Sequence, residues 1–174
     1  MTNIIEEFSL WLDGEILKPT HYTVDIISNN LNINDIWAES VTIPGRSIAT
    51  QERRTFGPQR EMPYERLYSG DLDITFMFSA AIGGGGKQIR SKLESWMDEI
   101  INPETNVINS AYENYTGSIK ISVDYPDGAE AWQIEVDEVY PKTISPVQLG
   151  YGINDEYLKQ SVSFAFREYK ITRG

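Results

Sequence analysis

One segment of this 174-residue chain has the period of an α-helix, and it limits what the rest of the chain can form. Within residues 87–101 (KQIRSKLESWMDEII), the apolar side chains recur every three or four positions: Ile89, Leu93, Trp96, Met97, Ile100 and Ile101. They form one apolar stripe, with charged and polar residues on the opposite face. Pro103 ends the helix. We therefore expect one amphipathic helix that covers an apolar surface supplied by strands.

Alternation of apolar and polar residues predicts strands on both sides of this helix. The clearest case is 71–78 (DLDITFMF), in which every second residue from Leu72 is apolar. Further strands are expected at 20–27, 36–43, 117–125, 132–140 and 161–169. The Pro-Asp-Gly sequence at 126–128 predicts a turn that makes two of these strands an antiparallel pair. In the second of that pair the apolar pattern shifts, which predicts a bulge near Asp137.

Two stretches have no clean period. Residues 46–70 predict a strand followed by a protruding loop, and a second strand hidden in this stretch is the alternative. Residues 3–12 (NIIEEFSLWL) are interpreted as a short helix.

Six or seven strands with one helix predict a mainly β fold with one flanking α-helix. The two antiparallel sheets would pack as a sandwich or an open barrel, because the regular alternation of helices and strands that a parallel sheet needs is absent. The length and the 40% hydrophobic content fit one folded domain spanning 1–174.

Composition excludes several kinds of site and partner. The chain has no Cys and one His, so a zinc or thiol enzyme is excluded. No apolar run reaches the ~18 residues that span a bilayer, and residues 1–8 lack the pattern of a signal peptide, so we expect a soluble protein. A net charge of −11 disfavours sequence-independent binding of nucleic acid.

A glycine-rich stretch at 76–88 (FMFSAAIGGGGKQ) imitates a phosphate-binding loop. Ala81 stands where that motif needs Gly, and Gln88 stands where it needs Ser or Thr. A flexible hinge before the helix is the favoured interpretation, and we predict no cofactor.

Carboxylates are abundant on the predicted strands, mainly as Asp71, Asp73, Glu135, Asp137 and Glu138. A glycosidase needs two of them ~5–10 Å apart, which neighbouring strands could provide. Because 26 acidic residues produce such pairs by chance, a solvated sheet face is the favoured interpretation. We predict no catalytic residue.

His21 lies on the polar face of its strand, which favours a surface histidine over a general base. The four Trp residues could stack on sugars, but each lies on an apolar stripe or strand face, where core packing accounts for it: Trp11, Trp37, Trp96 and Trp132.

Arginine is concentrated in the irregular stretch. Five of the fifteen basic residues fall there: Arg46, Arg53, Arg54, Arg60 and Arg66. Arg forms forked contacts with carboxylates and is favoured at interfaces. A basic arm on an acidic body suits a head-to-tail contact with another copy, which generates rings or stacks. The alternative is a solvated loop.

The order of these features resembles the tail tube protein of contractile-tailed bacteriophages. Five segments carry the resemblance, which covers nearly the whole chain: LKPTHYTVDI (17–26), VTIPGRSIAT (41–50), the Asp-rich strand and helix DLDITF and KLESWMDEII, YPKTISPVQLGY (140–151) and QSVSFAFREY (160–169). The four glycines at 83–86 depart from that layout.

The resemblance implies a structural protein whose copies close into homo-hexameric rings with a continuous inner β-barrel. Stacked rings would form a tube inside a contractile sheath, joined to a baseplate, that conducts DNA without binding it. The protein would be assembled in the host cytoplasm and located in the virion tail. A lumen that passes DNA should be anionic, so we expect some of Asp71, Asp73, Glu135 and Asp137 to line it.

Three alternatives remain. A protein that initiates the tube at the baseplate has the same fold. A carbohydrate-binding β-sandwich would show a row of exposed aromatic residues on one sheet face. For an acid/base hydrolase, the evidence would be hydrolysis that is abolished when one carboxylate is removed.

Overall fold

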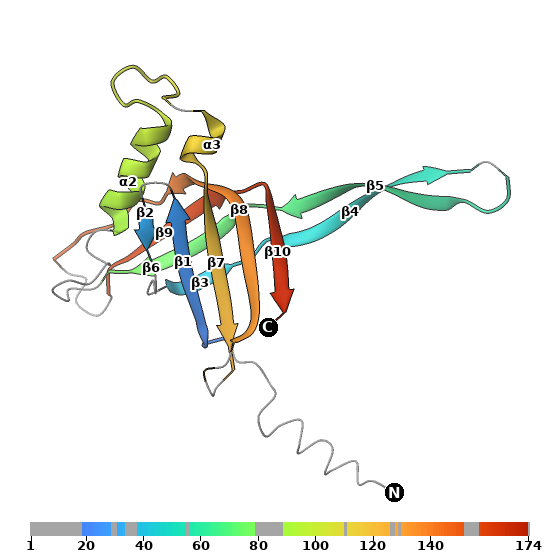
Figure 1. Cartoon of the computed structure of the whole chain (residues 1–174), viewed down its shortest axis with the longest axis horizontal. Coiled ribbons are helices and arrows are strands. Elements are labelled where there is room, and N and C mark those ends of the chain that lie inside the picture. Colours follow the sequence, from blue (N-terminus) through green and yellow to red (C-terminus); the bar gives the residue numbers. More distant parts are fainter. Residues whose placement is uncertain are drawn as a thin grey trace, which may run out of the picture.

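The structure is a computed structural model that describes residues 19–28, 31–33, 38–54, 56–78, 89–109, 111–125, 128, 130–151 and 157–173. Within these ranges the chain forms ten strands and two helices. The strands build two antiparallel layers and one separate hairpin (Figure 1). The predicted fold class is therefore confirmed, although the number of strands exceeds the six or seven expected.

The first layer contains five strands in the order β2-β1-β7-β8-β10. Their bounds are β1 (Tyr22–Ser28), β2 (Leu31–Ile33), β7 (Gly117–Asp124), β8 (Glu130–Ile144) and β10 (Glu168–Arg173). β7 and β8 form the antiparallel pair predicted around the turn at 126–128. Near the end of β7, the Gly128 N–H donates to the Tyr125 carbonyl at 2.9 Å. Gly128 has a φ of +86°, a conformation that glycine adopts without strain.

The second layer contains β3 (Ala38–Thr42), β6 (Leu72–Met77), β9 (Lys159–Ala165) and the end of β8, in the order β8-β9-β6-β3. β8 joins the layers: it pairs with β7 and β10 up to Val139, and with β9 from Tyr140 onward. At the junction Ser118 pairs with Asp137 whereas Gly117 pairs with Val139, so Glu138 is an extra residue with a φ of +54°. The predicted bulge is confirmed, and it lies where β8 leaves one layer for the other.

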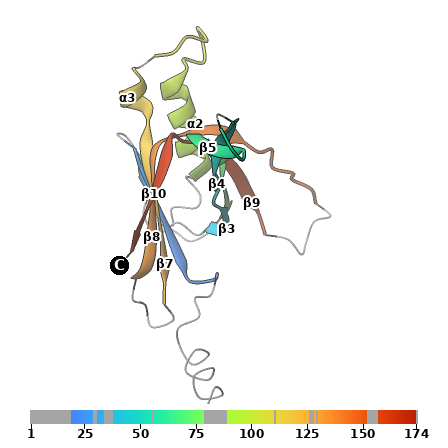
Figure 2. The ribbon, with the colours of Figure 1, turned by 90° about the vertical axis from the view of Figure 1, so that its right-hand side faces the viewer.

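The core lies between the two layers, which Figure 2 shows edge-on. Alternate residues of β1, β6, β7, β8 and β9 enter it, as the apolar pattern predicted. Val24 and Ile26 of β1 are fully buried from one side, and Leu72, Ile74 and Phe76 of β6 are fully buried from the other.

Helix α2 (Ile89–Ile100) closes one end of the sandwich, followed by the short helix α3 (Tyr112–Tyr115). The predicted apolar stripe of α2 is confirmed at three positions, because Ile89, Leu93 and Trp96 are buried. The Trp96 indole N–H donates to the Tyr115 carbonyl at 2.7 Å, and its ring lies 6.4 Å from that of Phe164. One helix therefore covers the apolar end that the two layers leave open.

A fully buried amide, Gln160 of β9, fixes the start of α2. Its Oε1 accepts from the Arg90 guanidinium at 3.0 Å, and its Nε2 donates to the carbonyls of Ser145 and Ser161. Every polar atom of this side chain is thus paired inside the protein, as burial requires.

Two strand predictions were incomplete. The stretch 161–169, expected as one strand, is divided between β9 and β10, because the chain crosses from the second layer to the first at Phe166 and Arg167. β2 was not expected at all, since three residues are too few to show alternation. Residues 3–12, Trp11, Trp37 and the glycines at 83–86 lie outside the described residues.

The irregular stretch forms a long hairpin of β4 (Gly45–Arg53) and β5 (Arg60–Ser69). The prediction of a strand followed by a loop was wrong in its second half, where the alternative of a strand pair holds. An extra residue, Tyr64, bulges between the pairs Ala49–Glu65 and Thr50–Pro63. The hairpin extends away from both layers (Figure 1).

Candidate functional site

The outer face of the second layer is polar and carries two of the predicted acidic residues. Asp73 and Thr75 alternate with the buried Leu72 and Ile74, so they point away from the core. The Ser163 hydroxyl donates to Asp73, and the Thr75 and Ser161 hydroxyls are 3.0 Å apart. Around Asp73 this surface carries hydroxyl groups. Lys159 of β9 lies on the same face as Ser161, and its Nζ is 3.4 Å from the Glu39 carboxylate.

Asp71 lies just before β6 and forms an ion pair with Lys142, whose Nζ is 2.7 Å from the carboxylate. The hydrogen bond to Asp71 raises the pKa of Lys142, and the nearby negative charge adds to this effect. Both side chains are partly open to water, so the pair positions its charges more than it stabilises the fold.

The outer face of the first layer carries the other two predicted acidic residues, Glu135 and Asp137. Lys170 of β10 lies 2.8 Å from Asp137, and that hydrogen bond raises the pKa of Lys170. Glu135 is paired in register with Lys120 on β7 and with Lys170 on β10. Basic and acidic groups are therefore interspersed on this face.

The four acidic residues proposed for a lumen thus occupy two opposite outer faces, with the core between them. Asp71 and Asp73 belong to the second layer, and Glu135 and Asp137 belong to the first. A single bore could be lined by one of these pairs, and the sequence contains no signal that separates them.

The second layer has open edges. Among the described residues, β3 pairs with β6 alone, and the stretch Tyr140–Ile144 of β8 pairs with β9 alone. Each edge presents backbone N–H and C=O groups along one side, which is a template for a strand of another chain. In the first layer, β2 and β10 are the corresponding outer strands.

The hairpin carries large apolar side chains in water. Phe56 is 96% exposed, Tyr64 67% and Ile48 64%. Nearly every residue of β4 and β5 is exposed, and Figure 1 shows no other strand or helix along the ribbon beyond its base. A two-stranded ribbon is marginally stable in water on its own, and contiguous apolar exposure of this kind marks an interaction surface.

The base of the hairpin is fixed to the sandwich by an aromatic cluster around Arg46. The Arg46 guanidinium lies 4.4 Å from the Tyr169 ring centre, and its Nη2 donates to the Tyr169 carbonyl at 2.6 Å. Tyr68 packs against Phe166 and Tyr169, with ring centres 5.2 Å apart in both pairs. Arg46, predicted to face a neighbouring subunit, therefore contacts its own chain. Residues 123 positions apart make this contact, so no local pattern could have revealed it.

The other predicted arginines lie along the hairpin and at its tip. Arg53 is paired directly opposite Arg60, and Arg66 is paired opposite Ile48. Arg54 follows the end of β4 and is exposed. At the tip, Arg53 and Arg60 line a hollow of about 360 Å³ together with Phe56, Pro58 and Met62. The tip thus combines apolar surface with charges of both signs, because Glu52 and Glu61 pair next to Arg53 and Arg60.

The structure gives little support to chemistry on small molecules. His21 is exposed, and its ring Nδ1 lies 3.4 Å from the Thr20 hydroxyl. The described residues contain no group of three or more His, Cys, Asp or Glu side chains that could hold a metal ion. None of the helices in the described part of the chain is long and apolar enough to span a membrane.

Exposed aromatic side chains form no row on either outer sheet face of the described structure. They lie on the hairpin, on α3, at the end of β7 and in the loops before β9: Phe56, Tyr64, Tyr112, Tyr125, Tyr151 and Tyr157. Trp96 is buried and Trp132 is partly buried, as core packing predicted. This arrangement disfavours the carbohydrate-binding sandwich.

Comparisons with known proteins agree with this architecture. No curated protein sequence matches the chain. The cap that terminates the tube of the anti-feeding prophage is similar in structure, with a TM-score of 0.63 at 12% identity, over 91% of this chain and 92% of that one. A chain of the sheath-tube complex of an extracellular contractile injection system gives 0.63 at 15% identity, over 95% and 97%. Hcp1 of E. coli EAEC 042 gives 0.51 at 8% identity, over 88% and 91%.

At such low identity the structural likeness shows a shared fold. The sequence itself carries the family: a model of the phage tail tube protein family matches residues 17–172, nearly the whole chain. The protein therefore belongs to the phage tail tube protein family, and it is a structural protein and not an enzyme.

Proposed function

We propose that this chain, as one domain, closes into hexameric rings that stack into the inner tube of a contractile tail, through which DNA is ejected. Family membership supports the coarser role of a virion tail tube component. The observation that carries the finer proposal is the second layer, a four-stranded sheet with open edges and a polar outer face.

Lateral pairing of these edges would close the ring. The free side of β3 on one copy would pair with the Tyr140–Ile144 stretch of β8 on the next. Six copies that contribute four strands each would form a barrel of about 24 strands, and barrels of about 16–18 strands already enclose an aqueous channel. Closure also removes the open edges, which otherwise invite aggregation.

We infer that the outer face of the second layer lines the bore. Duplex DNA carries about one negative charge per 1.7 Å, and each Lys or Arg that it meets releases counterions and holds it. Asp73 accepts from the Ser163 hydroxyl and lies beside the hydroxyls of Thr75 and Ser161. The lysines of this face are each paired with a carboxylate, Lys142 with Asp71 and Lys159 with Glu39. The first layer carries Lys120 opposite Glu135 on β7, and Lys170 beside Asp137 on its outer strand β10. Because Asp71 and Asp73 belong to the layer whose open edges would pair in a ring, they are the two acidic candidates that we place in the bore.

The hairpin would contact the neighbouring subunits. Two like charges directly opposite each other across a strand pair are unfavourable, and Arg53 faces Arg60 in this way. Carboxylates of a second, acidic copy would relieve this repulsion, and its surface would cover Phe56 and Ile48. Arg54 and Arg66 would add to the same contact, whereas Arg46 holds the hairpin at the required angle.

The sheath and the baseplate are the proposed further partners. Similar chains come from a sheath-tube complex, a tube-terminating cap and a baseplate, with TM-scores between 0.63 and 0.64. A protein that initiates the tube would share the fold, and its rings would stop growing after one or two layers.

Electron microscopy of the concentrated full-length protein tests the proposal. We expect six-fold rings with an open bore, stacked into tubes of constant diameter. Rings that never stack beyond two layers would assign the chain to tube initiation. A monomer that persists at millimolar concentration would overturn the proposal.

A charge reversal tests the role of the hairpin. Arg53→Glu should abolish the stacked tubes while the monomer keeps its circular dichroism spectrum and its melting temperature. Lys92→Glu, at a partly exposed position of α2 away from the hairpin, is the matched control and should leave the tubes intact. If Arg53→Glu assembles as the wild type does, the hairpin is not the contact.

A further inference from the structure

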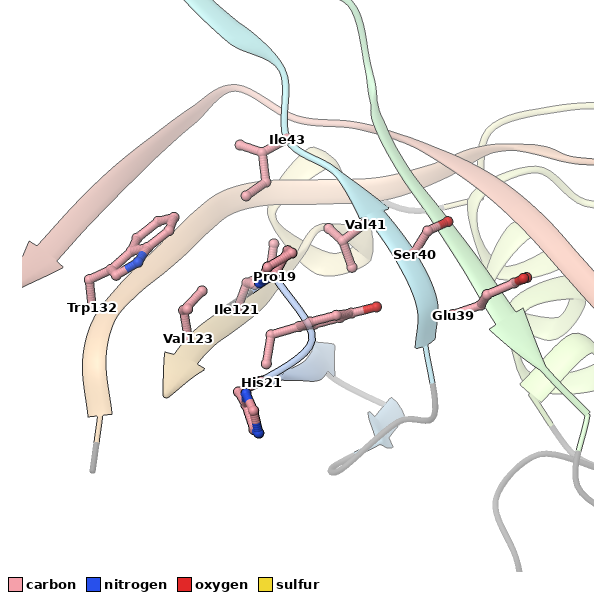
Figure 3. A pocket seen from close by; sticks show the side chains of 10 residues that line it. Pro19, His21, Glu39, Ser40, Val41, Ile43, Ile121, Val123 and Trp132 are labelled. Carbon is pink, nitrogen blue, oxygen red and sulfur yellow. The ribbon is translucent and has the colours of Figure 1, made fainter. Parts of the chain in front are cut away.

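An apolar groove opens between the two layers at the end of the sandwich opposite α2. Its volume is about 320 Å³. Figure 3 shows Val41 and Ile43 on the side of the second layer, facing Ile121, Val123 and Trp132 of the first. Ile121 is buried, but the other four are only partly covered. The layers therefore diverge here and leave core-type side chains in contact with water.

Polar groups mark one side of the groove and leave its centre apolar. His21, Glu39 and Ser40 belong to its lining. The Tyr22 hydroxyl crosses from the first layer to the second and donates to the Ala38 carbonyl at 2.8 Å. This bond ties β1 to β3, and burial raises the pKa of the Tyr22 phenol, with the charge of Glu39 contributing. The two layers are thus linked at this side of the groove, and an apolar occupant would remove its apolar lining from water.

The chain itself supplies a segment of suitable chemistry. Pro19 lines the groove, and the eighteen residues before it lie outside the described structure. Within them, residues 3–12 (NIIEEFSLWL) contain six large apolar side chains, two of which are aromatic: Ile4, Ile5, Phe8, Leu10, Trp11 and Leu12. In an acidic chain of moderate hydropathy, such a concentration needs an apolar surface to cover it.

The length of chain between residues 3–12 and the groove indicates whether the segment comes from the same chain or from another copy. Seven positions separate Leu12 from Pro19, and an extended chain of that length reaches about 25 Å. A short tether of this kind gives an effective concentration in the millimolar range, well above that of a segment from a separate molecule in dilute solution. We propose that residues 3–12 bind the groove of their own chain and complete the core between β3, β7 and β8.

Engineered disulfides test this directly, because the chain has no Cys of its own. In full-length protein, Ser9→Cys is combined with Val123→Cys, which places one thiol in the segment and one in the groove. The matched control combines Ser9→Cys with Thr172→Cys. Thr172 is exposed and pairs with Gln133, so it lies on the outer face of the same layer. Mild oxidation of dilute protein is followed by electrophoresis with and without reductant.

We expect an internal disulfide in the groove pair, seen as a monomer of altered mobility, at several times the yield of the control. Disulfide-linked dimers in the groove pair would show that another copy fills the groove and would overturn the same-chain proposal. Equal yields in the two pairs would overturn it as well. Ring formation is not needed for the internal disulfide, so this result is independent of the proposed tube.

A second measurement, the binding of a dye, needs no engineered cysteine. Trp11→Asp should expel the segment and uncover the groove, so that binding of an environment-sensitive apolar dye rises severalfold. Glu7→Gln, on the same segment, should leave dye binding unchanged. Unchanged dye binding in Trp11→Asp would contradict the proposal.

Discussion

The sandwich and the β4–β5 hairpin are built from the same kinds of residues and differ in what covers them. In the sandwich, Phe76 and Phe164 are fully buried, and the buried amide of Gln160 has all its hydrogen bonds made within the chain. On the hairpin, Phe56 is 96% exposed. The centre of the sandwich is covered within the monomer, whereas no other described strand or helix covers the hairpin beyond its base.

This difference separates folding from assembly. The sandwich residues set the free energy of unfolding, because their removal leaves cavities or unpaired polar groups. The hairpin residues contribute little to that energy, since they are already in water in the monomer. Substitutions in the two regions should therefore affect different measurements, and each prediction below tests this division.

The largest effect is expected for a truncation in the core. Phe164→Ala removes a fully buried ring that packs against Trp96, and should lower the free energy of unfolding by about 3–5 kcal/mol. Urea denaturation measures it. Phe56→Ala, the same substitution on the hairpin, should change stability by less than about 0.5 kcal/mol. If the two variants lose the same free energy of unfolding, the separation between folding residues and assembly residues is refuted.

A smaller effect is expected where the core is polar. Gln160→Leu keeps the approximate volume but leaves the Ser145 carbonyl without this donor. The Arg90 guanidinium loses one acceptor and keeps its bond to Glu94. An unpaired buried group costs about 1–3 kcal/mol, so stability should fall by that amount in urea denaturation. Gln148→Leu is the control, because Gln148 is exposed in a loop. A loss confined to Gln148→Leu would contradict the role of the buried amide.

The base of the hairpin should lie between the two extremes. Arg46→Lys keeps the charge but loses the planar group that lies 4.4 Å from the Tyr169 ring centre. We expect a loss of about 0.5–1 kcal/mol, the usual size of a partly exposed cation–π contact. Arg66→Lys, farther along the hairpin, should have no measurable effect on stability. If both substitutions behave alike, Arg46 does not anchor the hairpin.

The smallest effect concerns pH. A hydrogen bond from Tyr157, with a further contribution from Lys159, lowers the pKa of Glu39 below its ordinary value of 4.5. A depressed carboxyl pKa stabilises the fold above the ordinary pKa, and this contribution is lost as the pH falls through the folded-state value. Between about pH 5 and pH 3, the wild type should therefore lose slightly more thermal stability than Glu39→Gln. Parallel melting curves for the two proteins would show that the contact contributes nothing.

Much of the fold could be predicted from local patterns. The stripe of α2, the alternation of β1, β6 and β7, and the bulge in β8 all follow from residues close together in the chain. The division of 161–169 into β9 and β10 could not be predicted, because its apolar pattern continues across the point where the chain changes layer. β5 could not be predicted either, since a strand exposed on both faces has no alternation to detect.

The sequence by itself determined most of the residues that enter the core, although Ile101 of the predicted stripe is 44% exposed. It also determined that the body is acidic and that the arginines are concentrated between residues 46 and 66. These properties are local, since they depend on the period and the charge of short segments. Only the tertiary structure decided that Asp71 and Asp73 share a face separate from Glu135 and Asp137, that Arg46 contacts Tyr169, and that a groove opens beside Trp132. Each of these facts depends on how strands distant in the sequence pair and on which side of the core they lie, and the composition of a single strand contains no information about either.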